Sequence, residues 1–283
     1  RVVMIGDHRQ LPPVVKNVGF KTYCRLDQSM FARFVRLGVP SIQLDAQGRA
    51  RPTLARLYSW CYDELGDLPS TSRGIYEIEN PGFVHELQFV NVGDYHGRGE
   101  IEPTPHFYQN LGEAEYVVNV FQYMRLIGYP ASKISIITTY RGQKHLIRDI
   151  IARRCAHHPL FGVPSRVTTV DKYQGQQNDY VLLSLVRTRS VGHMRDIRRM
   201  VVALSRARLG LYVFGCMPLF ERCIELSKSI RNFLEYPTKL ALVPTESYPS
   251  EMIRKQKATP YLVEDATAMG HVVNQLAVKF GFG

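Results

Sequence analysis

The stretch VTTVDKYQGQQNDYVLLSLVRT (residues 167–188), followed by RRMVVALSRARLGLYVFG (198–215), decides the fold of this chain. Residues 180–186 form an almost unbroken apolar run, which is typical of a strand buried on both faces of a parallel sheet. A polar loop with a glycine precedes this run, residues 198–208 have helical spacing, and 211–215 are apolar again. The order strand, loop, strand, helix, strand predicts an α/β fold.

The polar loop and the helix also indicate a ligand site. In open α/β sheets, ligands bind in the loops beyond the strand ends. Arg199, Arg206 and Arg208 lie off the apolar face of the helix, so they are available to solvent or to a ligand. Glutamines in a loop and fixed guanidinium groups suit a polyphosphate. For the arginines alone, a solvated helix face is the competing interpretation.

Three strings resemble motifs of superfamily-1 helicases in the correct order. GDHRQLPP (6–13) resembles motif III, TVDKYQGQQND (169–179) resembles motif V, and VVALSRAR (201–208) resembles motif VI. The longer strings LDAQGRARP, NLGEAEYVV, ITTYRGQKHLIRDII and GQQNDYVLLSLVRTRSVGH extend the resemblance over roughly residues 1–235. They are similar to the branch that contains an intron-binding helicase of the spliceosome and the helicase of nonsense-mediated decay. The resemblance implies a RecA-like parallel sheet with helices on both faces.

The resemblance also implies three parts. Residues 1–40 are expected to be the C-terminal end of a first RecA-like domain, 41–235 a second RecA-like domain with motifs IV, V and VI, and 236–283 a C-terminal extension. Strands are expected at 2–5, at Ile42 and Leu44, and at 87–92 and 134–137; helices are expected at 27–37, 53–65, 110–128 and 266–280. The chain contains no G-x-x-x-x-G-K-[ST] loop, so we expect it to be part of a larger protein and inactive alone.

Catalysis in this family uses ATP and Mg²⁺ in a cleft between two domains, and the resemblance assigns residues to it. Gln10 is expected to sense the γ-phosphate, Arg49 to reach it across the cleft, and Arg206 to complete the phosphate clamp. Further nucleotide contacts are expected from Asp7, Gly175, Gln177 and Arg208, with most Mg²⁺ ligands outside this chain. A surface salt bridge is the alternative for Arg49.

Three positions depart from the family pattern. Gly48 stands where relatives have an aromatic residue that stacks on the base. Gln177 replaces a glutamate, and Val201 replaces an asparagine. A glutamine can still hydrogen-bond a ribose hydroxyl but carries no charge, so nucleotide affinity or turnover is expected to differ from that of relatives.

Nucleic-acid contacts are expected where motifs IV and V leave their strands. Hydroxyl groups there can bind phosphates, and a tyrosine can stack on a base. The residues are Thr138, Tyr140, Thr168, Thr169 and Lys172. For Tyr140, a partly buried aromatic ring at a strand end is an equal alternative.

Composition agrees with a polyanionic partner. The 283 residues include 36 Lys or Arg and 25 Asp or Glu, a net charge of +11. The five cysteines show no paired spacing, which favours a reducing compartment, and no metal site is expected. No apolar run approaches the length of a membrane span, so no membrane partner is expected.

Together these features predict an ATP-dependent RNA helicase or translocase that acts in pre-mRNA splicing. It is expected to be an RNA-stimulated ATPase in the nucleus, with single-stranded intron or pre-mRNA and spliceosomal proteins as partners. Two alternatives stay open: a degenerate helicase that serves as an RNA-binding scaffold, and a DNA helicase of the same superfamily.

Overall fold

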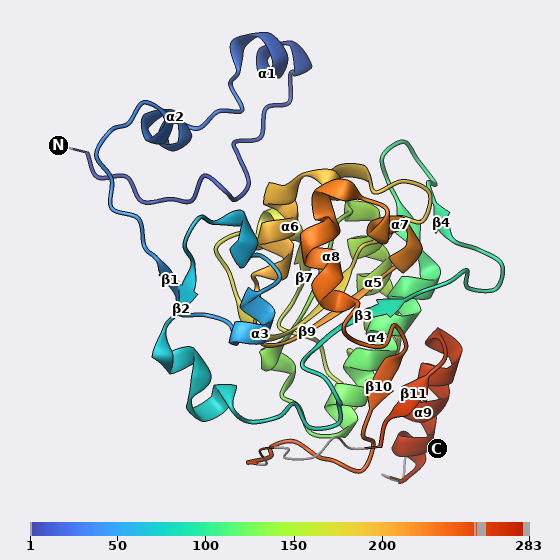
Figure 1. The fold of residues 1–283 in the computed structure, drawn as a ribbon. Coiled ribbons are helices and arrows are strands. Elements are labelled where there is room, and N and C mark those ends of the chain that lie inside the picture. The colour runs from blue at the N-terminus through green and yellow to red at the C-terminus, as the bar shows by residue number, and fades with distance from the viewer. Residues whose placement is uncertain (1, 252, 254–258, 280–283) are drawn as a thin grey trace.

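A five-stranded parallel sheet forms the centre of the molecule, in the order β3-β9-β8-β6-β7 (Figure 1). The computed structural model describes residues 2–251, 253 and 259–279. The strands of this sheet are β3 (Leu87–Asn91), β6 (Ile134–Thr138), β7 (Arg166–Thr169), β8 (Asn178–Ser184) and β9 (Ala207–Gly215). The predicted RecA-like α/β fold is confirmed, as are the strands expected at 87–92 and 134–137.

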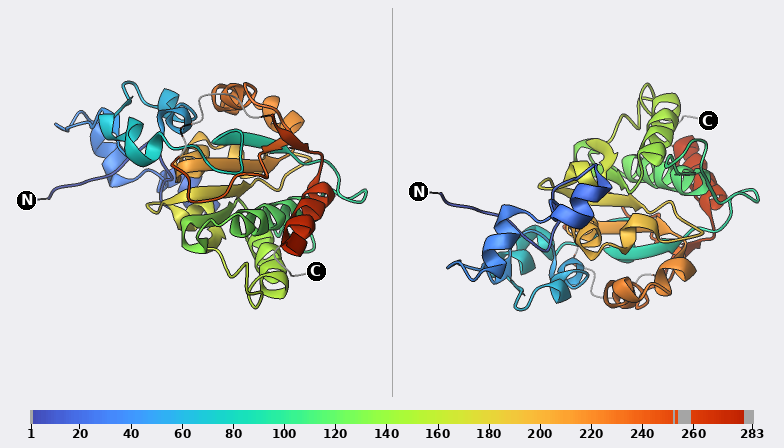
Figure 2. Two further views of the ribbon diagram at one scale, coloured as in Figure 1. Left: turned by 90° about the horizontal axis from the view of Figure 1, so that it is seen from below. Right: turned by 90° about the horizontal axis from the view of Figure 1, so that it is seen from above.

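Both faces of the sheet are buried, because successive side chains alternate between two apolar cores. On β8, Tyr180 and Leu182 enter one core, whereas Val181 and Leu183 enter the other. Helices cover the sheet on both sides (Figure 2). A strand in such a position needs apolar residues throughout, which is why the run at 180–186 has no polar alternation.

The helices and short strands surround this sheet. The helices are α1 (Val18–Cys24), α2 (Met30–Arg36), α3 (Pro52–Ala55), α4 (Leu111–Leu126), α5 (Arg141–Arg154), α6 (Ile197–Leu204), α7 (Met217–Glu221), α8 (Ser227–Phe233) and α9 (Ala266–Lys279). The short strands pair as β1 (Ala46–Gln47) with β2 (Gly66–Asp67), β4 (Glu100–Ile101) with β5 (Gln109–Asn110), and β10 (Leu240–Leu242) with β11 (Tyr261–Val263). α4, α5 and α9 contribute to the first core, which contains Tyr180 and Leu182. α3, α6, α7 and α8 contribute to the second core, which contains Val181 and Leu183.

The C-terminal extension packs on the first core. α9 buries Met269, Val272 and Val273 there, and the side-chain amide of Asn119 on α4 donates to the carbonyl of Ala266 (2.9 Å). The helix expected at 266–280 is confirmed to Lys279, and Phe280 lies outside the described residues. The domain boundaries at residues 40 and 235 stay predictions.

The first 44 residues differ from the prediction. No strand forms at 2–5, where Ile5 is 97% exposed, nor at Ile42 and Leu44, and residues 2–44 lie outside the central sheet in Figure 1. A buried parallel strand needs neighbours on both sides, and none of the described strands lies beside these residues. The helix expected at 27–37 is the shorter α2, and its Met30 and Phe34 are exposed.

The helix expected at 53–65 is also shorter. α3 ends at Ala55, and only the 3₁₀ segment Ser59–Cys61 follows. The carbonyl of Leu57 accepts from the Ser229 hydroxyl (2.6 Å) and the Trp60 indole N–H (3.1 Å), so side chains replace a helical donor there. Leu54, Leu57 and Tyr58 are nevertheless buried.

α4 begins as predicted, although its glutamate has another role. The Asn110 side chain accepts from the Glu113 N–H (3.1 Å) and so caps the start of the helix. The reciprocal capping bond is absent, because the Asn110 N–H donates to Gln143 (2.8 Å). The fully buried Glu113 carboxylate instead accepts from the Ser184 hydroxyl (2.6 Å) and the Val186 N–H (2.8 Å). Burial raises the pKa of Glu113 to about 8, and these hydrogen bonds oppose that shift.

We expect Glu113→Gln to flatten the pH dependence of stability. The folded pKa lies above the unfolded value of 4.5, so the ionised form is less favourable in the folded protein. The free energy of unfolding of the native chain should therefore fall as pH rises through this window, by up to about 1.4 kcal/mol per pH unit. Urea denaturation at about pH 5 and about pH 8 measures the difference. If the free energy of unfolding falls equally in the native chain and in the variant, Glu113 is not the group responsible for the pH dependence.

Candidate nucleotide and nucleic-acid sites

Two arginines predicted for the nucleotide meet at Ser205. Arg49, which follows β1, donates to the Ser205 carbonyl (3.0 Å), and Arg206, which precedes β9, donates to the Ser205 hydroxyl (2.6 Å). Arg49 also donates to the side-chain oxygen of Gln177 (2.6 Å), the residue that departs from the family pattern. The structure thus brings together three of the predicted nucleotide-site residues from different parts of the chain.

Arg206 is buried without a carboxylate among the described residues. It is 1% exposed and donates to the carbonyls of Val202 (2.9 Å) and Gln176 (3.2 Å). Burial lowers the pKa of Arg206 to about 10, and the positive charge of Arg49 contributes further. Two neighbouring cations whose hydrogen bonds go to neutral oxygens form a favourable site for an anion.

Gln10 reaches this pair from the N-terminal segment. Its side-chain oxygen lies 3.5 Å from Arg206 Nη2, and its amide donates to Asp7 (2.8 Å). Asp7 also accepts from the Arg9 N–H (2.8 Å) and from the Tyr62 hydroxyl (2.7 Å). Asp7 therefore orders the loop that carries Gln10. Nothing in the sequence pattern pointed to Tyr62, whose pKa is raised by burial and by Asp7.

The other predicted nucleotide residues lie in two places. Gly175 has φ +80°, which favours glycine, and a Cβ there would meet no atom within 4 Å. Arg208 donates to Asp179 (2.6 Å) and to the Tyr76 hydroxyl (3.3 Å), and this hydroxyl in turn donates to the Arg49 carbonyl (3.0 Å). Its contribution to nucleotide binding stays a prediction.

The register of the sheet brings the predicted nucleic-acid residues to one edge. Thr138 at the end of β6 pairs with Thr169 on β7 and with Ser184 on β8. Thr138 is fully buried, and its hydroxyl has no hydrogen-bond partner in the described part of the chain. Thr168 is half-buried and Lys172 is exposed. These positions lie at the carboxyl ends of parallel strands, where ligands bind in such sheets.

Tyr140 is buried rather than presented at the surface. Its hydroxyl accepts from Arg187 (3.4 Å), and its ring packs against Tyr108 and His193. This matches the alternative of an aromatic ring enclosed at a strand end, so base stacking by Tyr140 stays a prediction.

A cluster of cations beside Lys172 was not identified from the sequence. Arg141, Lys144 and Arg148 follow one another at helical spacing on one face of α5. Burial lowers the pKa of Lys144, and the positive charges of Arg148, Lys172 and Arg141 lower it further. We call Arg141, Lys144, Arg148 and Lys172 the basic cluster. The spacing 141, 144, 148 on one helix face was the available signal, but its proximity to Lys172 depends on the β6–β7 register.

Metal-ligand groups and membrane-spanning helices are absent from the described residues. They contain no group of three or more His, Cys, Asp or Glu side chains that could hold a metal ion. None of the described helices has the length and apolar character needed to span a membrane.

Comparison with known proteins confirms the resemblance seen in the sequence. Residues 26–218 match a protein family described as an AAA domain. The chain is 55% identical over 275 residues to the RNA helicase aquarius of Mus musculus, covering 97% of this chain and 18% of the relative. It is 33% identical over 253 residues to the pre-mRNA-splicing factor cwf11 of Schizosaccharomyces pombe (89% and 20%). It is 34% identical over 224 residues to a regulator of nonsense transcripts 1 homolog of Arabidopsis thaliana (76% and 18%). The chain therefore spans about a fifth of the length of these relatives.

Tyr62→Phe tests the attachment of the N-terminal loop. Loss of the hydroxyl removes one hydrogen bond to a carboxylate, which contributes about 1.5–3 kcal/mol. We expect faster hydrogen–deuterium exchange at residues 8–12 and unchanged exchange in β8 and β9. Tyr261→Phe, on exposed β11, is the matched control. Unchanged exchange at 8–12 would show that Asp7 holds the loop without Tyr62.

Proposed function

Because the chain belongs to the AAA-domain family, we propose that it is the second-domain half of an ATP-dependent RNA helicase of the spliceosome. The names of its relatives, RNA helicase aquarius and pre-mRNA-splicing factor cwf11, support this function. The single structural observation that carries it is the meeting of Arg49 and Arg206 at Ser205 without a carboxylate partner in the described residues.

The proposed nucleotide site fits a triphosphate. Bound ATP supplies the phosphoanhydride bond, and the chain's residues position and stabilise the negative charge that develops on cleavage. Arg49 and Arg206 provide this stabilisation from one side of the cleft, and Gln10 lies within reach of Arg206. The chain's residues do not fit a Mg²⁺ site, since Asp7 is occupied by three protein donors and the described residues hold no metal-ligand cluster.

The proposed RNA site is the edge formed by the ends of β6 and β7 and the basic cluster. Four cations there, with the threonines of the strand ends, suit the sugar–phosphate backbone rather than base edges. Such binding has weak sequence preference and strong salt dependence. A nuclear location and spliceosomal protein partners follow from the same proposal.

Helix α6 connects the two sites in this proposal. Near its start, Arg199 forms a bidentate ion pair (3.0 and 3.4 Å) with Asp171, a residue that follows β7. At its end the chain continues into Ser205 and Arg206. Movement of the RNA-binding loop is thereby transmitted to the nucleotide contacts through one rigid helix.

The two alternatives predict different measurements. A scaffold binds RNA without hydrolysing ATP, and a DNA helicase is stimulated at least as well by single-stranded DNA as by RNA of the same length. The departures from the family pattern at Gly48, Gln177 and Val201 favour the scaffold. Gln177, however, binds Arg49, and Val201 is a core residue, so two of these departures have structural roles here.

We expect Arg206→Ala in the full-length protein to reduce RNA-stimulated ATP turnover by about 10³-fold or more, as for the loss of an arginine finger. Steady-state phosphate release measures the effect. Arg56→Ala is the matched control, because Arg56 is exposed and pairs only with Glu235 among the described residues. The 283-residue chain alone should show no turnover, since its sequence lacks a P-loop. Equal turnover in Arg206→Ala would remove Arg206 from the mechanism.

We expect the double variant Lys144→Ala/Lys172→Ala to bind RNA more weakly for every sequence tested. Fewer released counterions should also make the slope of log K against log salt shallower, by about 0.7 per lost contact to a single strand. Fluorescence anisotropy with uridine and adenosine homopolymers at several salt concentrations measures both effects. Lys228→Ala on α8 is the control. An unchanged slope would place the RNA elsewhere.

A further inference from the structure

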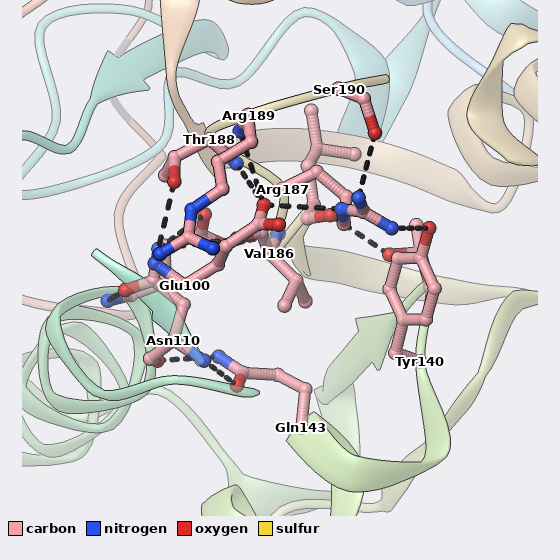
Figure 3. Close-up of polar contacts among 12 residues, drawn as sticks. Glu100, Asn110, Tyr140, Gln143, Val186, Arg187, Thr188, Arg189 and Ser190 are labelled. Atoms are coloured by element: carbon pink, nitrogen blue, oxygen red, sulfur yellow. Dashed lines mark hydrogen bonds and ion pairs between the residues drawn. The ribbon is translucent and has the colours of Figure 1, made fainter. Parts of the chain in front are cut away.

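Arg187 joins three segments just beyond the end of β8. Its Nε donates to Glu100 (3.1 Å), one Nη donates to the Ser190 hydroxyl (2.6 Å), and the other lies 3.4 Å from the Tyr140 hydroxyl (Figure 3). The guanidinium carbon lies 4.0 Å from the centre of the Tyr108 ring. The loop after β8, the β4–β5 hairpin and the loop after β6 are therefore held by one side chain.

Glu100 neutralises Arg187 and also fixes the main chain beside it. The same carboxylate oxygen accepts from the N–H groups of Thr188 and Arg189 (3.2 Å for Arg189; Figure 3). The side chains of Glu100 and Arg187 are 4% and 11% exposed. Removing one partner of such a buried pair leaves an uncompensated charge, so the loop cannot keep this arrangement without Glu100.

The turn that directs Arg187 into this cluster is strained. Val186 has φ +74°, a conformation that β-branched residues rarely adopt. The Arg187 N–H donates to the Leu185 carbonyl (2.9 Å), which closes a γ-turn of the less common, positive-φ form. Both main-chain groups of Val186 are bound by the start of α4: its N–H by Glu113 (2.8 Å), and its carbonyl by the Asn110 amide (3.2 Å). Strain of this kind persists only where the surroundings fix it, and it is concentrated at functional positions.

The contact of Arg187 with Tyr140 also affects the position of the basic cluster. Tyr140 directly precedes α5, and its carbonyl accepts from the Lys144 N–H (3.2 Å). Arg141 and Lys144 therefore take their positions from the main chain at Tyr140. Because Arg187 binds the Tyr140 hydroxyl, its position is coupled to that of the helix turn that carries two of the four cations.

We propose that Glu100 and Arg187 are positioning residues for RNA: they lock the loops after β6 and β8 together so that the basic cluster has one fixed geometry. This inference rests on the proposed function. Neither residue touches the RNA backbone in this proposal; both act through Tyr140 and the turn at Val186. Rigid placement of cations raises affinity because less ordering is needed on binding.

Glu100→Gln tests the lock without any ligand. We expect hydrogen–deuterium exchange to accelerate several-fold at 186–190 and also at 138–144. The described hydrogen bonds of the Glu100 side chain go to residues 187–189 and not to residues 138–144. Arg187→Lys, which keeps the charge but lacks the planar fork, should give the same two changes. The matched control is Glu115→Gln, which breaks the Arg154–Glu115 pair between α4 and α5. Acceleration confined to 186–190 would overturn the coupling to Tyr140.

RNA affinity of the full-length protein gives the second measurement. Loss of a negative charge should by itself strengthen binding to a polyanion. We instead expect Glu100→Gln to weaken binding of a uridine homopolymer by about 3- to 30-fold, the size of a typical coupling energy. Glu115→Gln removes the same charge and should not weaken it. If the native protein binds no RNA, the proposed function fails. If the native protein binds RNA and Glu100→Gln binds it equally well or better, the positioning role fails.

Discussion

A parallel sheet buried on both faces restricts charged side chains to the ends of its strands. Every strand of the central sheet points in the same direction, so these ends collect at one edge. At that edge the described residues place the unpartnered Thr138 hydroxyl, the buried Glu113 carboxylate and the Glu100–Arg187 pair. The apolar cores thus determine where charged chemistry can occur, and they position the residues that line it.

Charged side chains have different partners at the end of β8 and around Ser205. Glu100 and Arg187 neutralise each other in a nearly dry environment, which gives a fixed loop. Arg49 and Arg206, in contrast, approach each other and hydrogen-bond to neutral oxygens. A satisfied ion pair suits a structural role, whereas two unneutralised cations suit the binding of an anion that comes and goes.

The central sheet could be predicted from the sequence because each strand carries a local signal. The run at 180–186 and the strands β3 and β6 were found from apolar character, and α4 was found as the helix expected at 110–128. The N-terminal strand at 2–5 was not, because an apolar run reports a preference for burial and not the presence of a partner. The 53–65 helix failed for a similar reason, since Ser229, far away in the chain, takes the Leu57 carbonyl.

For the candidate sites too, residues with a local sequence signal could be predicted and residues that depend on distant partners could not. Motif resemblance identified Arg49, Arg206 and Gln10, whose contacts the structure then supplies. It could not identify Tyr62 or Glu100, whose partners Asp7 and Arg187 lie 55 and 87 positions away in the chain. The basic cluster was missed because it depends on strand register. Gly48, where relatives carry an aromatic ring, is exposed, and a Cβ there would lie 2.8 Å from the Leu68 side chain.

The packing of α9 against α4 has a consequence for synthesis of the protein. α4 buries nearly all of its residues, and part of its cover is the helix Ala266–Lys279, which follows the last sheet strand by some fifty residues. During translation, the ribosome has released β9 well before α9 emerges from its exit tunnel. The apolar flank of α4 therefore stays open to water and to chaperones until α9 emerges and covers it.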